Sequence, residues 1–345
     1  MLMTAECATS EELLKDFQQS RAGNYSRLMR MPCRVAVAID FARSVADGLA
    51  RRPRRLDCRF LYDPKGSELY ERICEQPEYY PTRIEAAILA ACASDICCIT
   101  GPVTILELGS GCSVKTDHLL AAYTKAYGPL HYVPIDVSES ALQQAGRDIT
   151  SRYSQVRVTG INGTYEESFH VFETASPALI LFLGSTVGNF DEKEADDFWR
   201  SIAGHMTAGD HFLIGVDLVK DRAVLEAAYD DAAGVTAAFT RNLFARMNRE
   251  LGASLDLDTI KHVARYRTDR ERIEIHARFT KQQLINIAPL GESFAIHSGE
   301  EILVEISRKF RLADLPAFFA LYGFQVRQTY TDERNWFAVL LLQKV

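Results

Sequence analysis

A glycine-rich turn followed by an acid is the part of this sequence best suited to chemistry. The apolar run 104–108 ends in Gly109-Ser110-Gly111, and the next apolar run, 131–135, ends in Asp136. Glycines let the backbone turn sharply and approach a ligand closely. An acid at the end of the following strand can accept hydrogen bonds from both ribose hydroxyls. The spacing therefore predicts a nucleoside-binding site that includes Gly109, Gly111 and Asp136.

The same turn argues against a dinucleotide. The third glycine of the dinucleotide fingerprint is absent. Glu107, just before the glycines, would be unwelcome near a pyrophosphate but would suit a cationic ligand. The pattern E-x-G-x-G resembles the first motif of the class I S-adenosylmethionine-dependent methyltransferases, whose cofactor has a sulfonium, an ammonium and no phosphate. A tight strand-to-helix turn without any ligand remains the alternative for the glycines alone.

Length and composition fit an ordinary soluble protein of one large domain or two interlocked ones. The chain has 345 residues, of which 47% are hydrophobic and 25% charged, and its net charge is −7. This acidity gives no electrostatic reason to expect a nucleic-acid partner, and the short basic run 51–55 is best interpreted as a solvated loop. No apolar stretch reaches about 18 residues, so we expect no membrane span. The acidic N-terminus lacks an apolar signal segment, so we expect a cytoplasmic protein.

The eight cysteines form no C-x-x-C pair, and no nearby histidine completes a zinc site. We therefore expect free, mostly buried thiols in a reducing compartment, and no metal cofactor.

Strand-like and helix-like segments alternate through the middle of the chain. The expected strands are 104–108, 131–136, 156–161, 178–185 and 211–217, and the expected helices are 115–126, 139–152 and 193–206. This alternation predicts an α/β fold with a doubly wound, Rossmann-like parallel sheet covered on both faces. Ligands bind such sheets beyond the carboxyl ends of the strands, where the strand order reverses.

After Asp217 the pattern changes. Helices are expected at 222–229, 236–251 and 312–322, with strands at 272–280, 283–287, 302–310, 324–331 and 336–344, which predicts an α+β cap. We therefore divide the chain into an N-terminal extension (1–30), a cofactor-binding domain (84–219) and a substrate-binding α+β domain (31–83 with 220–345).

Polar groups that a simple fold would not need gather at 77–83, 184–189, 229–234 and 302–310. In the last of these, Glu305 and Ser307 share one face of the expected strand. A carboxylate in such an apolar stretch needs a partner. A salt bridge to Arg308, Lys309 or another basic group is the structural alternative to a ligand-binding role.

Eight segments together resemble the histidine-specific Nα-methyltransferases of ergothioneine biosynthesis. The resemblance runs from about residue 59 to the end of the chain. The segments are 62–63, 66–67, 77–83, 107–115, 184–189, 216–220, 229–239 and 305–310.

The resemblance implies an enzyme that transfers three methyl groups from S-adenosylmethionine to the α-amine of free L-histidine, giving hercynine and S-adenosylhomocysteine. Tyr62 and Asn189 would act at the reacting amine, as orienting groups rather than as proton acceptors. The implied substrate-binding residues are Tyr62, Tyr79, Asn189, Tyr229, Glu305 and Ser307, the last two at the imidazole. The implied cofactor-binding residues are Gly109, Gly111, Lys115, Asp136, Thr164 and Tyr165. We expect a monomer.

One position departs from the family. Members commonly have Gly-Asp-Phe where this chain has Gly163-Thr164-Tyr165, and the aspartate caps the adenine amino group. Thr164 would replace that bond only weakly or through its backbone, whereas Tyr165 can still stack on adenine.

Two other functions stay open at this point. A methyltransferase of the same fold for another aromatic amino acid, such as tryptophan, would not need a carboxylate at Glu305. A non-catalytic protein that binds S-adenosylmethionine would not need Tyr62, Asn189 and Tyr229.

Overall fold

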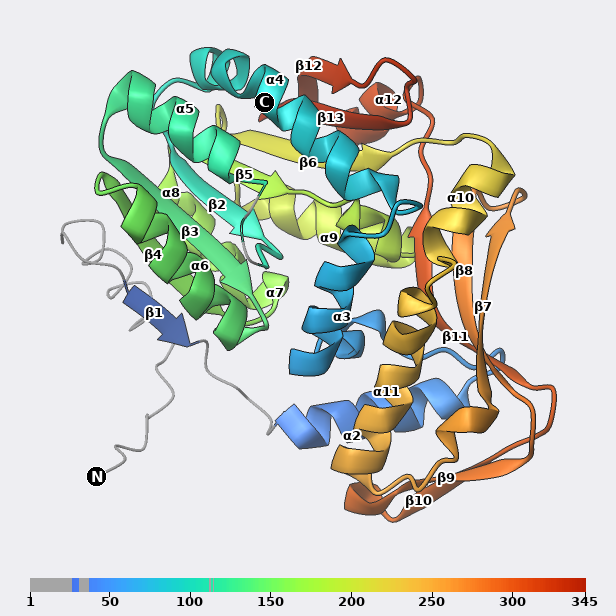
Figure 1. Ribbon diagram of the computed structural model, residues 1–345. Coiled ribbons are helices and arrows are strands. Elements are labelled where there is room, and N and C mark those ends of the chain that lie inside the picture. The colour runs from blue at the N-terminus through green and yellow to red at the C-terminus, as the bar shows by residue number, and fades with distance from the viewer. Residues whose placement is uncertain (1–26, 31–36, 112, 114) are drawn as a thin grey trace, which may run out of the picture.

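An eight-stranded sheet forms the centre of the molecule. The computed structural model describes residues 27–30, 37–111, 113 and 115–345, so most of the expected N-terminal extension lies outside it, as do Cys7, Cys33 and Cys112. The strand order is β1-β4-β3-β2-β5-β6-β13-β12 (Figure 1). The strands are β1 (Arg27–Arg30), β2 (Thr104–Leu108), β3 (Leu130–Asp136), β4 (Val156–Asn162), β5 (Ala178–Phe182), β6 (His211–Asp217), β12 (Phe324–Thr331) and β13 (Phe337–Lys344).

Five neighbouring pairs, from β1 to β6, are parallel, and β13 runs antiparallel to both β6 and β12. The strand order reverses between β2 and β5, which pair directly. The chain thus places the turn after β2 beside the loop after β5. This confirms the expected doubly wound Rossmann-like sheet, and the strand order reverses at the edge where the sequence predicts a ligand.

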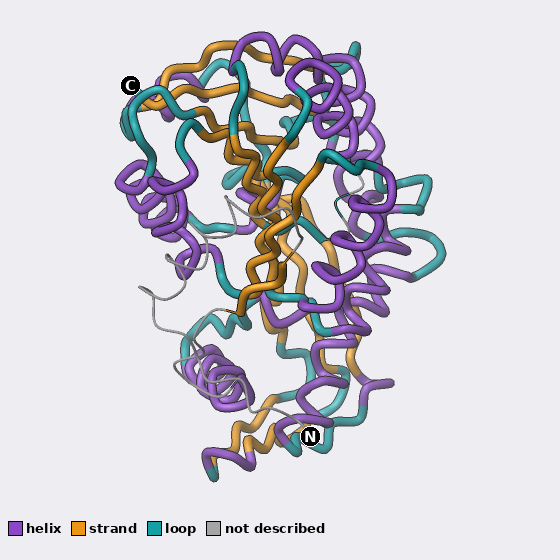
Figure 2. Tube along the Cα trace, turned by 90° about the vertical axis from the view of Figure 1, so that its left-hand side faces the viewer, coloured by secondary structure: helices purple, strands orange, loops and turns teal. Residues whose placement is uncertain are grey.

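Helices cover both faces of the sheet (Figure 2). Alternate side chains of each strand enter two different cores, so that Ile105 packs with one set of helices and Leu106 with the other. The first set is α4 (Tyr80–Thr100), α5 (Asp117–Tyr127) and α6 (Glu139–Arg152), and the second is α8 (Phe172–Ala175), α9 (Glu192–His205) and α12 (Leu315–Ala320), with α7 (Tyr165–Ser168) preceding α8.

Two expectations need correction. The segments 324–331 and 336–344 are strands, but they extend the central sheet instead of belonging to a separate cap. They form a hairpin whose inner strand is almost entirely buried against β6. The strand expected to reach residue 185 ends at Phe182, because Gly184 and Ser185 both have positive φ and the chain then turns into the 3₁₀ segment η3 (Thr186–Asn189).

The remaining elements share a separate core beside the central sheet (Figure 1). A three-stranded antiparallel sheet in the order β11-β8-β7 packs with α2, α3, α10 and α11, and the hairpin β9–β10 closes one end. The elements are α2 (Val37–Ala50), η1 (Cys58–Leu61), α3 (Pro64–Cys74), α10 (Arg222–Tyr229), α11 (Val235–Leu251), β7 (Ile260–Arg267), β8 (Arg272–Phe279), β9 (Gln283–Ile287), β10 (Glu292–Ile296) and β11 (Glu301–Arg308).

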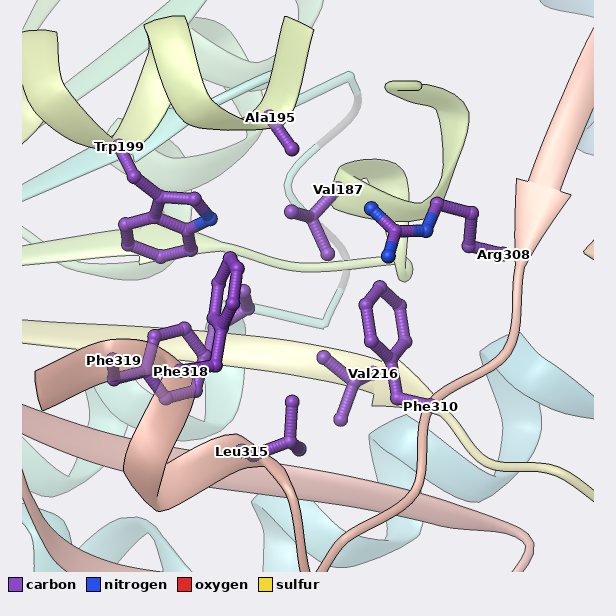
Figure 3. A pocket seen from close by; sticks show the side chains of 10 residues that line it. Val187, Ala195, Trp199, Val216, Arg308, Phe310, Leu315, Phe318 and Phe319 are labelled. Carbon is purple, nitrogen blue, oxygen red and sulfur yellow. The ribbon is translucent and has the colours of Figure 1, made fainter. Parts of the chain in front are cut away.

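A small cavity lies between α9, α12 and the central sheet (Figure 3). Apolar side chains line most of it, with Arg308 at one side. The indole nitrogen of Trp199 lines it too and has no hydrogen-bond partner among the described residues. Such a lining does not suit a zwitterionic amino acid, which needs several polar partners.

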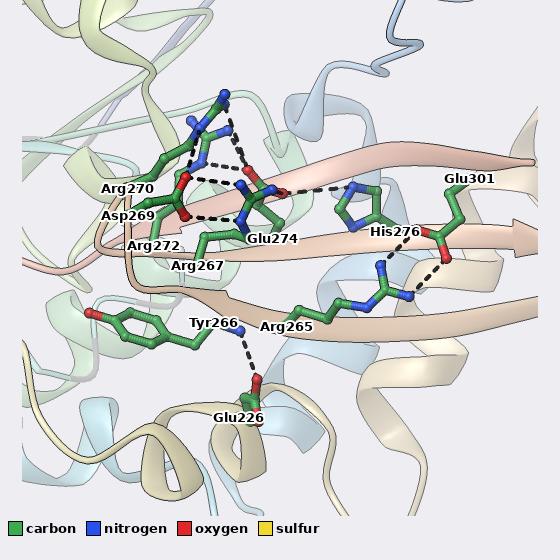
Figure 4. Close-up of polar contacts among 10 residues, drawn as sticks. All are labelled: Glu226, Arg265, Tyr266, Arg267, Asp269, Arg270, Arg272, Glu274, His276 and Glu301. Atoms are coloured by element: carbon green, nitrogen blue, oxygen red, sulfur yellow. Dashed lines mark hydrogen bonds and ion pairs between the residues drawn. The ribbon is translucent and has the colours of Figure 1, made fainter.

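Ion pairs cover the β7–β8 hairpin (Figure 4). Arg265 and Arg278 both pair with Glu301, and they lower the pKa of that carboxyl to about 2. The Glu226 carboxylate accepts a hydrogen bond from the backbone of Tyr266, 2.9 Å away, and so ties α10 to β7. These charged groups pair with one another and stabilise the three-stranded sheet.

Within the described part of the chain, no helix has the length and apolar character that crossing a bilayer requires. The five cysteines that the structure describes are all free thiols.

Candidate active site

The glycine turn, Asp136 and Tyr165 meet at the carboxyl ends of β2 and β3. Gly109 and Gly111 have φ of 66° and 50°. A Cβ on Gly109 would lie 2.7 Å from the Tyr165 hydroxyl, so only glycine lets this tyrosine approach the turn. The backbone N–H of Gly111 donates to Asp136 Oδ2 at 2.9 Å. Four of the expected cofactor residues therefore form one group.

This edge has room and unmet polar capacity for a nucleoside. No atom of the described residues outside the turn lies within 4 Å of where a Gly111 Cβ would be. The buried Ser110 hydroxyl has no hydrogen-bond partner among the described residues, and such groups in native proteins call for a ligand or water. The carboxylate of Asp136 accepts a hydrogen bond from the Ser138 backbone N–H at 2.8 Å. Burial raises the Asp136 pKa, although the backbone N–H groups that donate to the carboxylate lower it in part. The open space beside Gly111, the Ser110 hydroxyl and the Asp136 carboxylate thus fit the nucleoside that the sequence predicts here.

Glu107 does not face a ligand, contrary to expectation. Its carboxylate is 3% exposed and accepts hydrogen bonds from the Thr116 and Tyr132 hydroxyls. Burial raises its pKa to about 7. Glu107 instead fastens the start of α5 to the β2–β3 pair.

Lys115 is held by a carboxylate that sequence reasoning missed. Its ammonium pairs with Glu85, which is fully buried in α4. The Glu85 oxygens also accept from the backbone N–H of Gly184 at 2.8 and 2.9 Å. A Cβ on Gly215 would lie 1.9 Å from Glu85, so β6 makes space for it with a glycine. The available signal was a lone acid within the apolar run 84–93.

Thr164 is the N-cap of α7. Its hydroxyl accepts from the Glu167 backbone, and its own N–H donates to the Glu167 carboxylate at 2.9 Å. Both groups that could bind adenine are thus engaged in a capping box. The Tyr165 ring packs edge-on against Phe182, with centroids 5.4 Å apart.

On the other side of the site, Tyr62 is fixed by its neighbour Asp63. Asp63 caps α3 through the Gly66 N–H at 2.7 Å and accepts hydrogen bonds from Asn242 and Arg249 on α11. The Tyr62 ring packs edge-on against two further aromatic rings, those of Tyr70 and Phe239. Burial raises the Tyr62 pKa well above its ordinary value, and the charge of Glu305 raises it further.

Tyr79 and Tyr229 extend the same aromatic group. Their ring centroids lie 5.9 Å apart, and the Tyr70 ring also packs edge-on against Tyr79, with centroids 6.4 Å apart. The His262 ring contacts the Tyr229 backbone oxygen at 2.8 Å and the Thr240 hydroxyl at 2.8 Å, which fixes the end of α10.

β11 brings Glu305 to the edge of the central sheet. The chain after β11 pairs with the chain after β6, where the Phe310 N–H donates to the Asp217 backbone at 2.9 Å. η3 packs closely on β11, since a Cβ on Gly188 would lie 2.9 Å from the Arg308 backbone oxygen. Glu305 and Ser307 lie two residues apart on this regular stretch, as expected.

Glu305 lacks the salt bridge that was its structural alternative. No basic group of the described residues pairs with it, and Lys309 pairs with Asp217 instead. Its one hydrogen-bond partner there is the Asn189 amide, at 3.5 Å. Burial raises the Glu305 pKa to about 7, opposed by the charge of Lys309. This carboxylate is therefore available to a ligand that brings a donor.

Ser307 and Tyr229 contact each other, with their hydroxyl oxygens 2.8 Å apart. The buried Lys309 ammonium donates to both. The sequence indicates Lys309 only as a candidate partner of Glu305, because the position of Lys309 on the strand does not reveal its contact with Asp217.

The doubly wound sheet and the glycine turn beside Asp136 are those expected of a methyltransferase that uses S-adenosylmethionine. The model of the family described as "Histidine-specific methyltransferase, SAM-dependent" matches residues 41–344. The chain belongs to this family of histidine-specific, S-adenosylmethionine-dependent methyltransferases.

Named relatives agree with this assignment. The chain is 40% identical over 299 residues to the histidine N-alpha-methyltransferase of Mycolicibacterium smegmatis, covering 87% of this chain and 93% of the relative. It is 40% identical over 302 residues to the enzyme of the same name from Mycobacterium tuberculosis, covering 88% and 94%. The L-tryptophan methyltransferase of Psilocybe serbica is 26% identical, covering 87% and 92%.

Among solved structures, an S-adenosylmethionine-dependent methyltransferase from Clostridium acetobutylicum is similar to this chain with a TM-score of 0.38 and 12% identity. That similarity covers 73% of this chain and 90% of the other.

Proposed function

We propose that this protein transfers three methyl groups from S-adenosylmethionine to the α-amine of L-histidine, giving hercynine in the first step of ergothioneine biosynthesis. Its family and its two relatives named histidine N-alpha-methyltransferases support the reaction. The observation that supports histidine as the substrate is the Glu305 carboxylate, which lies beside Asn189 without an ion-pair partner among the described residues. An imidazole N–H supplies the donor that this carboxylate lacks.

Different residues of the site bind different parts of the substrate. Glu305 accepts the imidazole N–H, and Ser307 meets the other ring nitrogen. Asn189 and Tyr229 hold the amino-acid head group, Tyr62 orients the amine, and Tyr79 approaches the imidazole. A ligand that lacks the imidazole N–H leaves the half-buried Glu305 carboxylate unpaired, and an unpaired polar group of this kind discriminates by roughly 10⁴-fold in hydrogen-bonding sites.

Alignment is the main contribution of the protein. S-adenosylmethionine, when bound, supplies a methyl group already activated by the sulfonium. Gly109, Gly111, Lys115, Asp136 and Tyr165 hold it at the edge of the sheet. Thr164, whose hydroxyl and N–H are engaged in the cap of α7, would contact adenine without a hydrogen bond from either group. The aromatic side chains around Tyr62 lower the polarity near the amine and so favour its neutral, nucleophilic form. The positioning of the amine against the methyl donor then lowers the barrier.

Mass spectrometry of the products tests the reaction. Purified protein is incubated with S-adenosylmethionine and an equimolar mixture of the 20 amino acids. Histidine carrying three added methyl groups, with the other amino acids unchanged, is the expected product. Methylated tryptophan, the substrate named for the Psilocybe serbica relative, would overturn the role given to Glu305. The absence of any methylated product, with cofactor binding shown separately, would favour a non-catalytic binding protein.

Two variants on β11 test the specificity. Glu305→Ala should lose histidine selectivity and keep cofactor affinity, whereas Glu301→Ala, on the same strand but paired with surface arginines, should keep both. Equal histidine methylation by Glu305→Ala and wild type would refute the assignment.

We further propose a cytoplasmic monomer with no nucleic-acid or membrane partner. Five free thiols support a reducing compartment. Light scattering of the purified protein, with and without S-adenosylhomocysteine, measures the oligomeric state.

A further inference from the structure

The Lys309 ammonium is completely buried, and each of its three N–H groups has its own acceptor. It lies 2.8 Å from Asp217 Oδ2, 2.9 Å from the Tyr229 hydroxyl and 2.8 Å from Ser307 Oγ. An ammonium carries three donors and no lone pair. Lys309 therefore has no bond left for a substrate and can act on one only through the two hydroxyl groups.

The Tyr229 and Ser307 hydroxyl groups keep hydrogens that they can donate to a ligand. Each oxygen accepts one hydrogen bond from Lys309, and the two oxygens lie 2.8 Å apart. Tyr229 and Ser307 together bring two hydrogens. One hydrogen bridges the two oxygens, so the other must point away from the ammonium. When the bridge opens, both hydrogens become available to a ligand.

The charges around the Tyr229 and Ser307 hydroxyl groups also favour their role as hydrogen-bond donors. Asp217 accepts hydrogen bonds from Tyr80 at 2.9 and 2.8 Å and also pairs with Lys220. Two ammonium groups thus share one carboxylate beside the two hydroxyls. Among the described residues, the titratable and charged groups that face Lys309 or its partners are Asp217, Lys220, Tyr70, Tyr79, Tyr80, Tyr229, Tyr266, Glu305 and Asp332.

Glu305, two residues before Ser307 on β11, offers a hydrogen-bond acceptor instead of a donor. Residues at this separation on a strand lie about 7 Å apart, a span that an imidazole ring bridges with one hydrogen bond on each nitrogen. The ring needs a donor toward Glu305 and an acceptor toward Ser307. An imidazolium has donors on both nitrogens and no acceptor.

We propose that Lys309 is a positioning residue that makes Ser307 and Tyr229 hydrogen-bond donors, so that the enzyme binds histidine with a neutral imidazole in one tautomer. The nitrogen that carries hydrogen faces Glu305, and the bare nitrogen accepts from Ser307. The inference rests on the proposed function.

Nitrogen NMR of the wild-type protein reads the ring state directly. Histidine labelled with ¹⁵N in the imidazole is bound to the complex with S-adenosylhomocysteine at pH values from about 6 to 8. We expect one N–H nitrogen and one bare nitrogen throughout, including near pH 6, where free imidazole, with a pKa of about 6.5, is mostly protonated. Two N–H nitrogens in the bound ring would overturn the inference while leaving histidine methylation intact. If histidine does not bind at all, the proposed function itself fails.

Variants separate this role from a purely structural one. Lys309→Met should raise the KM for histidine about 10- to 100-fold, the range expected when one or two hydrogen bonds from the Ser307 and Tyr229 hydroxyl groups to the substrate are lost. The variant should also bind histidine with a protonated imidazole, so that its KM for histidine rises less steeply at acidic pH than the KM of the wild type. Lys309→Gln, which keeps donors without the charge, should recover part of the affinity.

The exposed Lys193→Met, which removes only a surface pair with Asp197, is the control. A folded Lys309→Met protein with a wild-type KM profile would overturn the inference. If Lys309→Met does not fold, the NMR result on the wild-type protein decides.

Discussion

Glu85 and Lys115 form an ion pair that joins α4 to the turn after β2. Glu85 is fully buried, and Lys115 is held at the point where the strand order of the sheet reverses. The pair therefore connects the packing of the core with the cofactor-binding edge.

Removal of the Glu85 carboxylate should affect stability and cofactor binding together. Glu85→Ala leaves a buried N–H on Gly184 and an unpaired Lys115, so we expect the free energy of unfolding to fall by about 3–5 kcal/mol. Glu85→Gln keeps a partner for Gly184 and should cost about half as much. Both variants should weaken S-adenosylmethionine binding about tenfold by releasing Lys115. Denaturant unfolding and calorimetric titration measure these effects. Glu68→Gln, an exposed pair with Lys65, should change neither quantity by more than about 0.5 kcal/mol.

Thr164→Asp should improve cofactor binding at little cost to the fold. Aspartate is as good an N-cap as threonine, so α7 keeps its cap and we expect a stability change within about 0.5 kcal/mol. The added carboxylate can accept from the adenine amino group, which should lower the cofactor dissociation constant several-fold. Titrations with S-adenosylhomocysteine measure the change. An unchanged affinity would show that adenine does not reach this cap.

Glu107 should make the free energy of unfolding depend on pH. Its folded pKa of about 7 is raised by burial above the ordinary value of 4.5. The native protein then holds a proton that the unfolded chain has released, so this group lowers stability as pH rises from about 4.5 to 7. In Glu107→Gln this contribution is absent. We expect the stability of the variant relative to wild type to rise across that range and to level off above about pH 7. A difference that does not vary with pH would contradict the assignment.

Gly188→Ala should separate η3 from β11. The new methyl group would meet the Arg308 backbone oxygen at 2.9 Å, so one of the two segments must move, at about 1–3 kcal/mol. Because Asn189 follows directly, we expect a KM for histidine about tenfold higher and a cofactor affinity near that of wild type. Gly204→Ala is the matched control and should keep the wild-type KM, because no neighbouring atom in the described part of the chain lies within 4 Å of the new methyl group. A normal KM for Gly188→Ala would show that the Asn189 position does not depend on this contact.

The cofactor edge was the most predictable part of the protein. Strand periodicity, the Gly109–Gly111 turn and Asp136 are all local in sequence, and the structure places them together. Lys309 and Glu85 were not predicted as functional, because their partners Asp217 and Gly184 lie 92 and 99 residues away in the chain. The hairpin 324–344 was predicted as strands but not as part of the central sheet, because a strand's own pattern does not say which neighbour it pairs with.

The sequence by itself determined the class of fold, the turn that fits a nucleoside and the family of the chain, since each depends on residues close together or on motifs of fixed spacing. Only the tertiary structure decided how charge is distributed in the site. It paired Lys309 with Asp217 and left Glu305 to Asn189, although Arg308 and Lys309 lie only three and four residues from Glu305 in the sequence. The physical reason is that the burial of an ionised group is tolerated only with a partner in contact, and which partner makes that contact depends on how β11 meets the end of β6.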